Sequence, residues 1–432
     1  MNLKKVKLGI LGIGYVGLPL SLSFARKYKV IAYDSNTKRI NELQKSIDTN
    51  NEFIKKNFEK IKENITFTNN KKDLADCKIY IVTVPTPINR NKRPNLNYIK
   101  LANNIIGSYL DNDNIVIYES TVYPGLTEEY CAPMLEKISK LNYRNEKNYM
   151  DIKNNFFYCG YSPERINPGD KKHVFETIPK IVAGSTNNIT KILYNLYSSV
   201  IKAKVYKAES IKIAEAAKVI ENTQRDLNIA LMNEFSLIFN KMNIDTNKIL
   251  KAASTKWNFL NFQPGLVGGH CISVDPYYLT YKSKKMGYNP KLILAGREIN
   301  DNMGKYISSI AIKKLKKNKS KKILILGLTF KENCSDLRNS QVYEIFKNLN
   351  NYYKVDIHDP LALDSEVKIV YNKKNEKILK NNYYNLIIIA VSHNIFKKIG
   401  IKKIQNLLLN KDKKNIIDVK SMFDQSSSFF RL

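Results

Sequence analysis

The residue best suited to covalent chemistry in this chain is Cys271, in the glycine-rich segment at residues 262–275 (FQPGLVGGHCISVD). Backbone N–H groups in such a loop can face a bound ligand, and a nearby positive field would favour the nucleophilic thiolate. The pattern therefore indicates a nucleophile, although a structural cysteine remains the alternative. His270 is its neighbour in the chain, and because adjacent side chains usually point apart we assign it no catalytic role.

Two further patterns could supply polar groups to a reaction. Lys218 and Asn222 lie four residues apart in the segment EAAKVIENTQRD at residues 215–226, which places them on one helix face. A lysine and an amide can stabilise a developing oxyanion, or they can simply form a polar helix surface. Glu164 lies in the proline-bracketed loop SPERINPG at residues 162–169, where it could act as a general base on water or cap the next segment.

The start of the chain predicts a dinucleotide site. An apolar run at residues 6–11 precedes GIGYVG at residues 12–17, a helical pattern at residues 18–25 and a second strand that ends at Asp34. In such a unit the glycines permit a tight turn, close approach of a pyrophosphate and helix packing, and the helix N-terminus faces the phosphates. Asp34 suits a ribose 2′-hydroxyl and would repel a 2′-phosphate despite Arg39 nearby, so the motif favours NAD over NADP.

The remaining pattern predicts an α/β protein with two Rossmann-like domains joined by a long central helical segment. The helix is expected at residues 210–239. Further strands are expected at residues 78–84, 114–118, 156–159, 180–183, 323–327, 355–359, 386–391 and 416–419. Loops of small and polar residues at 83–86 and 119–125 follow two of these strands, where open α/β sheets bind ligands.

These elements divide the chain into three expected domains. We predict an NAD-binding domain at residues 1–205, a central helical domain at 206–312 that carries the cysteine loop and a dimer interface, and a second Rossmann-like domain at 313–432. The lysine-rich run at 313–322 is expected to be a solvated helix end and linker.

Composition limits the classes of function. The 432 residues include 71 Lys+Arg and 39 Asp+Glu, a formal net charge of +32. A hydrophobic share of 43% excludes wholesale disorder, and no apolar run approaches the roughly 20 residues of a membrane span. The charge fits a nucleic acid, an anionic membrane surface or acidic small ligands, and equally a lysine-rich composition whose side chains are solvated.

Cysteine and histidine usage indicates the compartment and the absence of a metal. The 5 cysteines are scattered without a C-x-x-C pair, which is typical of a reducing compartment. The N-terminus lacks the apolar core and cleavage site of a signal peptide, so we expect a cytoplasmic protein. The 4 histidines have no ligand-like spacing, so we expect no metal site.

Taken together, the motifs resemble the UDP-glucose/GDP-mannose dehydrogenase family over nearly the whole chain. They occur in the family's order: GIGYVGLP (12–19), TVPTP (83–87), ESTVYPG (119–125), SPERINPG (162–169), AKVIENTQRD (217–226), PGLVGGHC (264–271) and GLTFKENCSDLRNS (327–340). SPERINPGD, GGHC and AGREIND (295–301) are similar to the branch acting on UDP-N-acetylhexosamines for capsule, O-antigen or Vi-type polysaccharide. UDP-glucose enzymes typically have Ser at His270, Lys at Val274 and an acidic residue at Pro168, which argues against UDP-glucose.

The resemblance implies oxidation of a sugar C6 alcohol to a carboxylate with two NAD⁺, no released aldehyde and no metal. Cys271 would capture the aldehyde as a thiohemiacetal, which is oxidised to a thioester. Lys218 and Asn222 would stabilise the alkoxide or oxyanion, and Glu164 would support thioester hydrolysis. The implied catalytic residues are Cys271, Lys218, Asn222, Glu164, Asp275 and Thr121, the last two orienting water.

The resemblance also implies the binding residues. Those for NAD are Gly12, Gly14, Tyr15, Val16, Gly17, Asp34, Arg39, Thr83, Pro85, Thr86, Thr121 and, from the C-terminal domain, Arg338. Those for the substrate are Glu164, Arg165, Lys218, Asn222, Phe262, Gly265, Gly268, Phe330 and Lys331. The C-terminal domain would bind the UDP moiety.

The expected partners are a UDP-sugar and a second copy of the chain, bound through the central helices, with neither nucleic acid nor membrane. UDP-glucose 6-dehydrogenase is the alternative enzyme. The alternative from another class is a basic nucleic-acid-binding protein, for which the sequence offers only lysines. The motifs leave the configuration of the N-acetylhexosamine open.

Overall fold

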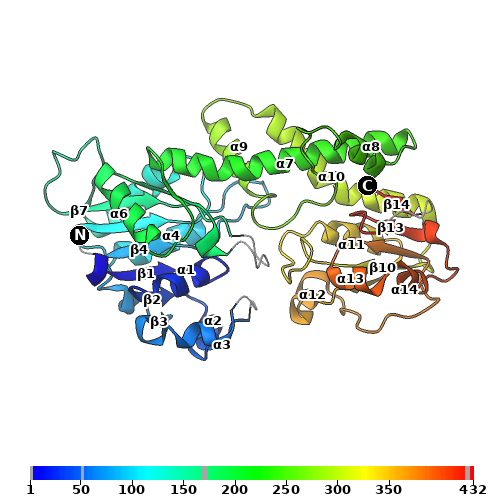
Figure 1. The fold of residues 1–432 in the computed structure, drawn as a ribbon, viewed down its shortest axis with the longest axis horizontal. Helices are drawn as coiled ribbons and strands as arrows, with labels where there is room; N and C mark the ends of the chain where they lie inside the picture. Colours follow the sequence, from blue (N-terminus) through cyan, green and yellow to red (C-terminus); the bar gives the residue numbers. More distant parts are fainter. Residues whose placement is uncertain (1–2, 50–52, 167–173, 424–428) are drawn as a thin grey trace. The chain divides into compact units, whose positions relative to one another are not determined.

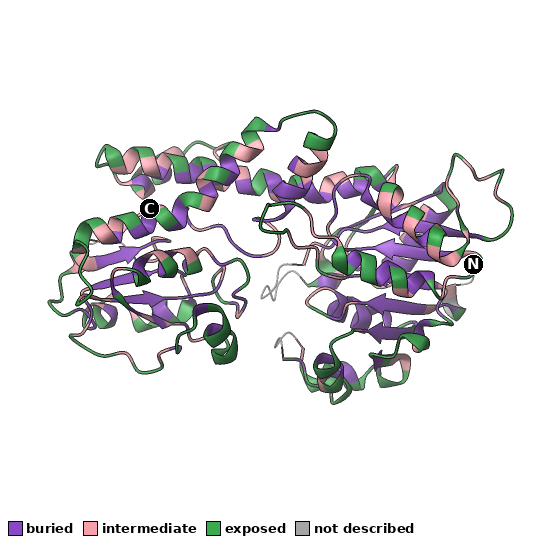
Figure 2. Cartoon of the chain, turned by 180° about the vertical axis from the view of Figure 1, so that it is seen from behind, coloured by how far each residue is buried: buried purple, intermediate pink, exposed green. Residues whose placement is uncertain are grey.

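The computed structural model describes residues 3–49, 53–166, 174–423 and 429–432, which form two compact units (Figure 1). The N-terminal unit comprises Met1–Glu221 with Tyr277–Gly287, and the C-terminal unit comprises Asn222–Pro276 with Tyr288–Leu432. Each unit is built on its own sheet, whose strands are largely buried while the outer helix faces are exposed (Figure 2). The three predicted domain ranges remain a prediction.

In the N-terminal unit the described residues form a nine-stranded sheet in the order β3-β2-β1-β4-β5-β7-β8-β9, with β6 paired to β7. All neighbours are parallel except β7 and β8. The strands are β1 Lys7–Leu11, β2 Lys29–Tyr33, β3 Ile65–Thr68, β4 Ile79–Val82, β5 Asn114–Tyr118, β6 Asn142–Tyr143, β7 Phe156–Tyr161, β8 Lys180–Gly184 and β9 Val205–Lys207. β4 and β5 are buried at every residue, as expected for parallel strands covered on both faces.

Helices pack on this sheet through their apolar residues. Leu20 and Phe24 of α1 and Leu193 of α6 share one buried cluster with Ile10 of β1 and Ile81 of β4. The helices are α1 Gly17–Phe24, α2 Thr37–Gln44, α3 Lys55–Glu59, α4 Asn97–Gly107, α5 Ala132–Ser139 and α6 Asn187–Ser198. Short 3₁₀ turns lie at Leu3–Lys5, Lys62–Asn64, Lys71–Leu74 and Phe175–Thr177, and a π turn at Thr127–Cys131.

Four helices follow in the middle of the chain: α7 Ile211–Lys241, α8 Thr246–Ala253, α9 Asp275–Lys285 and α10 Lys291–Leu315. α7 is the long helix that the sequence predicts. α10 was not predicted, because its buried positions 296, 297, 300, 303, 304, 307, 308 and 311 repeat at helical spacing but include Gly, Arg, Asn and Ser. A search for apolar periodicity does not detect such a face.

The C-terminal unit contains a parallel sheet in the order β11-β10-β12-β13-β14. Its strands are β10 Lys322–Leu326, β11 Lys354–His358, β12 Leu386–Ile389, β13 Ile416–Asp418 and β14 Phe430–Arg431. Its helices are α11 Val342–Asn350, α12 Asp364–Tyr371, α13 Asn394–Ile399 and α14 Ile401–Gln405, with a 3₁₀ turn at Lys413–Asn415. The lysine run at 313–322 covers the end of α10 and the start of β10.

The predicted α/β class, with two Rossmann-like sheets and a long helical segment, is confirmed. Among the described residues, no helix is both long and apolar enough to cross a membrane.

Candidate active site

The glycine turn after β1 is built as the sequence predicts. Gly12 has φ +97°, a conformation that favours glycine. A Cβ on Gly17 would lie 1.9 Å from the Gly12 carbonyl oxygen, so the helix can approach the strand only without a side chain there. Thr83, which follows β4, donates from Oγ1 to Leu11 O at 2.9 Å and to Gly12 O at 2.7 Å. These bonds hold two loops together at the edge of the sheet.

The surface above this turn suits a diphosphate. Gly14 is exposed, and a Cβ built on it would meet nothing within 4 Å. α1 begins at Gly17 with no acidic residue in its first turn and no side-chain cap from Val16. A helix N-terminus of this kind favours an anionic ligand. Three more of the predicted NAD-binding residues lie in these two loops: Tyr15 and Thr86 are half-exposed and Pro85 is exposed.

Asp34 and Arg39 hold the turn from the second strand and helix. Asp34 is half-buried and accepts from the N–H groups of Ile13 at 2.7 Å and Asn36 at 2.9 Å. Arg39 is buried, donates from Nε to Ile13 O at 3.2 Å and pairs through Nη1 with Asp48 at 2.8 Å. Asp34 therefore retains an accessible carboxylate, while the Arg39 guanidinium supports the turn; their contacts with NAD remain predictions. The residues present at this edge fit an NAD molecule.

The second predicted cluster of this unit surrounds Glu164, which is 8% exposed. One carboxylate oxygen accepts from the N–H groups of Arg165, at 2.5 Å, and Ile166. The other accepts from Nζ of Lys180 at 3.1 Å. Arg165 itself donates to Glu221 and to Pro179 O. The end of this motif, with Pro168, lies outside the described residues, because residues 167–173 are not described.

The loop of Thr121 is fixed by a residue that sequence reasoning missed. Glu215, on α7 one turn before Lys218, is fully buried and accepts from the N–H groups of Gly125 at 2.5 Å and Thr127 at 2.9 Å. Burial raises the pKa of Glu215 to about 7 despite these bonds. Thr121 is half-buried and Lys218 buried. A glutamate inside the apolar stretch IAEAA was the only sequence signal.

In the C-terminal unit Cys271 opens the turn that leads into α9. Its carbonyl accepts from the N–H groups of Val274 at 2.9 Å and Asp275 at 2.8 Å, and its side chain is half-exposed. Asn222 on α7 donates from Nδ2 to Asp275 Oδ2 at 2.5 Å. The structure thus brings together three of the predicted catalytic residues.

A buried polar network holds the start of the cysteine loop. The amide of Asn233 donates to Gly265 O at 3.0 Å and accepts from Gly265 N at 2.7 Å. Asn233 also bonds Asn300 at 2.7 Å, which bonds Asp226 at 2.7 Å. Asp226 pairs with buried Arg297 at 2.6 Å. None of these anchors was singled out from the sequence, although AGREIND contains two of them.

The other end of the cysteine loop packs on the segment after β10. A Cβ on Gly268 would lie 2.6 Å from Asn339 O, and one on Gly269 would lie 2.7 Å from the Phe330 ring. Phe330 and Lys331 are half-buried, as is Phe262 at the start of the loop. Predicted substrate residues from two distant segments therefore lie side by side.

Arg338 lies in the same segment and is paired with Asp336 at 2.6 Å, with His270 Nδ1 3.4 Å from its Nη2. Burial alone would raise the pKa of Asp336, but the hydrogen bonds and charge of Arg338 hold this pKa below its usual range. Arg338 as an NAD contact remains a prediction.

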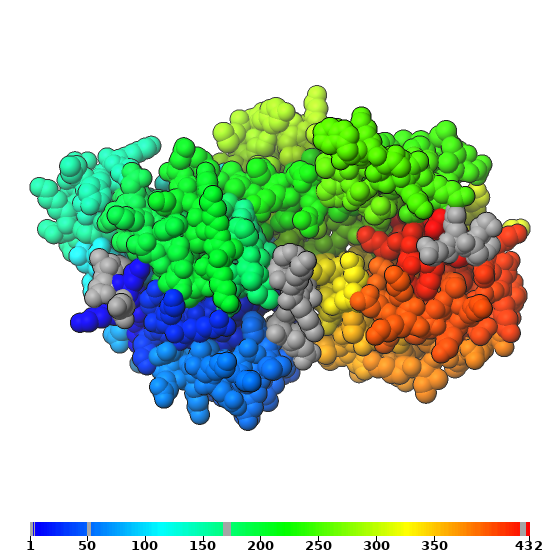
Figure 3. All heavy atoms as spheres, viewed as in Figure 1, coloured from blue at the N-terminus to red at the C-terminus, as the bar shows by residue number. Residues whose placement is uncertain are grey.

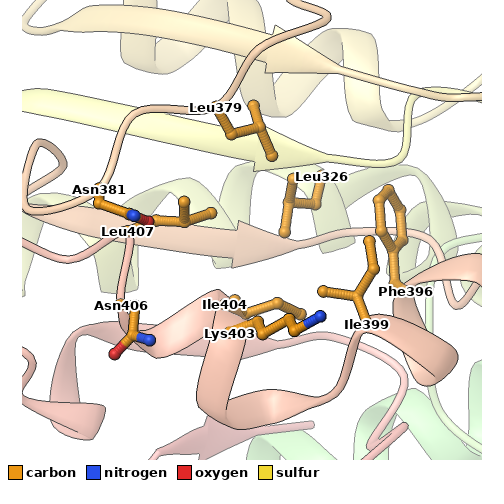
Figure 4. Close-up of a pocket in the computed structure, with 9 residues that line it drawn as sticks. All are labelled: Leu326, Leu379, Asn381, Phe396, Ile399, Lys403, Ile404, Asn406 and Leu407. Atoms are coloured by element: carbon orange, nitrogen blue, oxygen red, sulfur yellow. The ribbon is translucent and has the colours of Figure 1, made fainter.

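Other features of the described residues lie apart from these sets. No group of three or more His, Cys, Asp and Glu side chains there could hold a metal ion. An apolar pocket of about 330 Å³ in the C-terminal unit is lined by α13, α14 and neighbouring residues, among them Leu326, Phe396, Ile404 and Leu407 (Figure 4). It contains none of the predicted site residues.

Three domain models of the UDP-glucose/GDP-mannose dehydrogenase family match the chain in succession. The NAD binding domain matches residues 6–201, the central domain residues 212–302 and the UDP binding domain residues 324–425.

Relatives of similar length match end to end. The UDP-N-acetyl-D-glucosamine 6-dehydrogenase of Salmonella typhi is 48% identical over 436 residues, covering 100% of both chains. Protein CapL of Staphylococcus aureus is 47% identical, covering 96% of both chains. Among solved structures, the UDP-D-ManNAc dehydrogenase of Pyrococcus horikoshii has a TM-score of 0.84 at 27% identity, covering 99% of this chain and 98% of that chain.

Proposed function

Since the chain belongs to the UDP-glucose/GDP-mannose dehydrogenase family, as its motifs predicted, we propose that it oxidises the C6 alcohol of a UDP-N-acetylhexosamine to the carboxylate with two NAD⁺. The observation that carries the proposal is the grouping of Cys271, Asn222 and Asp275 at the start of α9. Because two full-length relatives at 48% and 47% identity are UDP-N-acetyl-D-glucosamine 6-dehydrogenases, the gluco sugar is the first substrate we propose.

The residues of the N-terminal unit suit the cofactor. The glycine turn and the start of α1 would hold the pyrophosphate, and Asp34 would accept hydrogen bonds from a ribose. Bound NAD⁺ supplies the hydride acceptor for both oxidations.

In the first oxidation the alcohol loses its proton and a hydride, and Lys218 with Asn222 stabilises the alkoxide. Sγ of Cys271 then forms a bond to C6 of the aldehyde, whose oxygen takes up a proton to give a thiohemiacetal. Loss of a second hydride and of that proton leaves a thioester.

Hydrolysis restores the enzyme. A water oriented by Thr121 and Asp275 adds to the thioester carbon, Glu164 takes a proton from it, and the C–S bond breaks to release the thiolate. The sum is RCH₂OH + 2 NAD⁺ + H₂O → RCOO⁻ + 2 NADH + 3 H⁺, which balances in atoms and charge.

The test is a substrate panel on the purified protein: the UDP forms of GlcNAc, GalNAc, ManNAc and glucose, and GDP-mannose. We expect about two NADH per UDP-N-acetylhexosamine consumed, as a four-electron oxidation through a covalent intermediate requires. Activity only on UDP-glucose or GDP-mannose would overturn the substrate, and no NADH with any sugar would overturn the reaction. Full four-electron turnover by Cys271→Ser would refute the nucleophile.

We also propose a homodimer that covers apolar side chains of α7, α8 and the segment after them. Six large apolar side chains in this part of the C-terminal unit are exposed: Leu231, Ile238, Met242, Ile244, Trp257 and Leu260. The α8 region lies at the surface (Figure 3). Trp257 is 91% exposed and is the single tryptophan of the chain, so its fluorescence should shift to the red on dilution if a dimer dissociates. Light scattering of Trp257→Lys should give the monomer mass, and an unchanged dimer would refute this interface.

We place the protein in the cytoplasm because its proposed nucleophile needs a reducing compartment, and no disulfide joins any of the five cysteines, all of which lie in the described part of the chain. The domain ranges 1–205, 206–312 and 313–432 remain our proposed division, with the UDP moiety bound by the last.

A further inference from the structure

Three charged side chains meet inside the N-terminal unit, at one edge of its sheet. Glu119 follows β5, Glu164 lies in the loop after β7 and Lys180 is the first residue of β8, and their exposures are 1%, 8% and 2%. Lys180 Nζ lies 2.6 Å from Glu119 and 3.1 Å from Glu164. Charges withdrawn from water are costly unless each is paired, so a buried group of three charges calls for a role beyond stability.

The sheet topology explains why Lys180 reaches this edge. β7 and β8 are antiparallel, with Tyr161 opposite Ala183 and Gly160 opposite Gly184. Continuing that register places Lys180 opposite Glu164. The start of β8 therefore lies at the edge where β5 and β7 end, which is the ligand edge of an open α/β sheet.

The carboxylate of Glu164 is held at both oxygens. Oε1 accepts from two backbone N–H groups, those of Arg165 and Ile166, and Oε2 accepts from Lys180. All three partners are donors. The two bonds to Oε1 use both lone pairs of that oxygen, whereas Oε2 keeps one further lone pair. These bonds fix the orientation of the group.

Lys180 is anchored on its far side. Glu119 accepts from Lys180 with Oε2 and from the Tyr197 hydroxyl on α6 with Oε1. The rings of Phe175 and Tyr197 lie 5.4 and 5.6 Å from Nζ. Burial lowers the pKa of Lys180, but Glu119 and Glu164 outweigh this and raise it, so the ammonium stays charged. Because Nζ lies nearer to Glu119 than to Glu164, the lysine charge is shared between the two carboxyl groups, and burial raises the pKa of Glu119 to about 7.

We propose that Lys180, anchored by Glu119, is the positioning residue of Glu164 and holds its carboxylate in place to take the proton of the water that hydrolyses the thioester. Since Glu119 is two residues before Thr121, the same contact joins the two loops that carry the proposed water-handling residues. This inference rests on the proposed function. Lys180 itself forms no bond with substrate and acts only through Glu164.

The test compares Lys180→Met with Lys180→Arg. A misplaced base typically costs about 100-fold in rate, so we expect Lys180→Met to lower kcat about 100-fold, with KM for NAD⁺ and sugar within about twofold. Because hydrolysis then limits turnover, the sugar thioester on Cys271 should accumulate and be visible as an added mass on the intact protein after acid quench. Lys180→Arg keeps the cation and should recover most of the rate without accumulation.

Two controls separate this role from a structural one. Lys78→Met removes a lysine of the same unit that pairs with Asp113 at 3.8 Å outside the site, and should leave kcat unchanged. Tyr197→Phe removes only the hydroxyl that anchors Glu119, and should show the same thioester accumulation with a smaller loss of kcat. If Lys180→Met does not fold, Tyr197→Phe decides the question: wild-type kcat without accumulation would overturn the inference.

Glu164→Gln distinguishes the two possible failures. If Glu164→Gln turns over normally, the proposed role of Glu164 is wrong. If Glu164→Gln accumulates thioester while folded Lys180→Met does not, Glu164 keeps its role and Lys180 does not position it.

Discussion

The two sheets of this chain share the arrangement of their first two strands and of the turn after the first strand. In each, the first strand lies inside the sheet between the second strand and a later one, in the orders β2-β1-β4 and β11-β10-β12. Each first strand is followed directly by a glycine with positive φ, Gly12 at +97° and Gly327 at +86°. Each second strand is followed by an aspartate, Asp34 or Asp359, that accepts from a backbone N–H of the turn, at 2.7 Å in both.

The residues after the glycine separate the two turns. Five residues after Gly12, α1 begins at Gly17, with exposed Gly14 between them. In the described segment 327–341 no α-helix begins, and the position that corresponds to Gly14 holds Thr329, which is fully buried. The first turn thus offers a helix N-terminus and open backbone to a phosphate, and the second offers neither.

The aspartate of the second turn is likewise less accessible to a ligand than the aspartate of the first. Asp34 is half-buried with two N–H donors, whereas Asp359 is fully buried and accepts from four N–H groups and from His393 Nε2 at 3.0 Å. His393 follows β12, and its Nδ1 accepts from Asn333 N. In the C-terminal unit, backbone N–H groups and the His393 side chain therefore occupy the bonds that a ligand could form in the N-terminal unit.

The largest effect should come from Gly17→Ala. Its Cβ would lie 1.9 Å from Gly12 O, a backbone atom that cannot move aside, so we expect a loss above about 4 kcal/mol and no NAD⁺ binding. The matched variant Gly14→Ala meets nothing within 4 Å and should keep wild-type urea stability while NAD⁺ affinity falls. A stable Gly17→Ala protein that binds NAD⁺ would refute the distinction.

Asp359→Asn should destabilise the C-terminal unit by about 3 kcal/mol, because an amide cannot accept all these donors and leaves buried groups unsatisfied. Hydrogen exchange of peptides from β10 to β13 measures this, with peptides from β1 to β5 unaffected. The control Asp364→Asn breaks an exposed pair with Lys377 but keeps an oxygen for Asn375, and should leave hydrogen exchange close to that of the wild type. Equal exchange in both variants would show that Asp359 is not the structural counterpart of Asp34.

The sequence predicted this comparison only in part. Strand positions and the glycine turn follow from continuous apolar runs and from Gly12, Gly14 and Gly17, because those patterns are local. Two Rossmann-like domains were predicted, but the burial of Asp359 was not, since it depends on His393, which lies 34 residues further along the chain. In the candidate active site, too, local motifs could be predicted and partners far along the chain could not.

Long-range polar anchors account for most of what was missed. Cys271, Glu164 and Lys218 could be singled out because they stand in motifs. Glu215 and Asn233, in contrast, bond to residues 90 and 32 positions away in the chain, and Lys180 bonds to a carboxylate of another loop. Nothing in the local pattern of IAEAA or KIVAG indicates such a partner. Sequence reasoning finds residues that act on ligands more readily than the ones that position them.

The two units should also differ in how stability responds to pH. Burial raises the pKa of Glu215 from 4.5 to about 7, so the folded N-terminal unit binds this proton more tightly than the unfolded chain. The stability it contributes is present below about pH 4.5 and is lost as pH rises to about 7. By pH 7 the loss is about 3 kcal/mol, since each pKa unit corresponds to about 1.4 kcal/mol.

The pKa of Asp359 is shifted in the opposite direction. Burial alone would raise this pKa, but the bond to His393 and the backbone N–H groups hold it below the usual range. Its contribution is present above the usual aspartate value and is lost only as pH falls below it. Urea unfolding of wild type and Glu215→Gln between pH 4.5 and 7.5 tests the difference. The unfolding free energy of Glu215→Gln should not fall over this pH range as that of the wild type does. Parallel plots of unfolding free energy against pH for the two proteins would contradict this prediction.

The smallest effect separates the aspartates by function. Asp34→Asn keeps an oxygen for Ile13 N but replaces a carboxylate by a weaker acceptor for the ribose, so we expect KM for NAD⁺ to rise about tenfold, or about 1.4 kcal/mol, with kcat and urea stability nearly unchanged. The same substitution at Asp359 should show the reverse, a loss of stability without a specific rise in KM for NAD⁺. If Asp34→Asn instead lowered stability as much as Asp359→Asn, both aspartates would serve the turn alone, and the half-exposed carboxylate after β2 would not be a ligand for the cofactor.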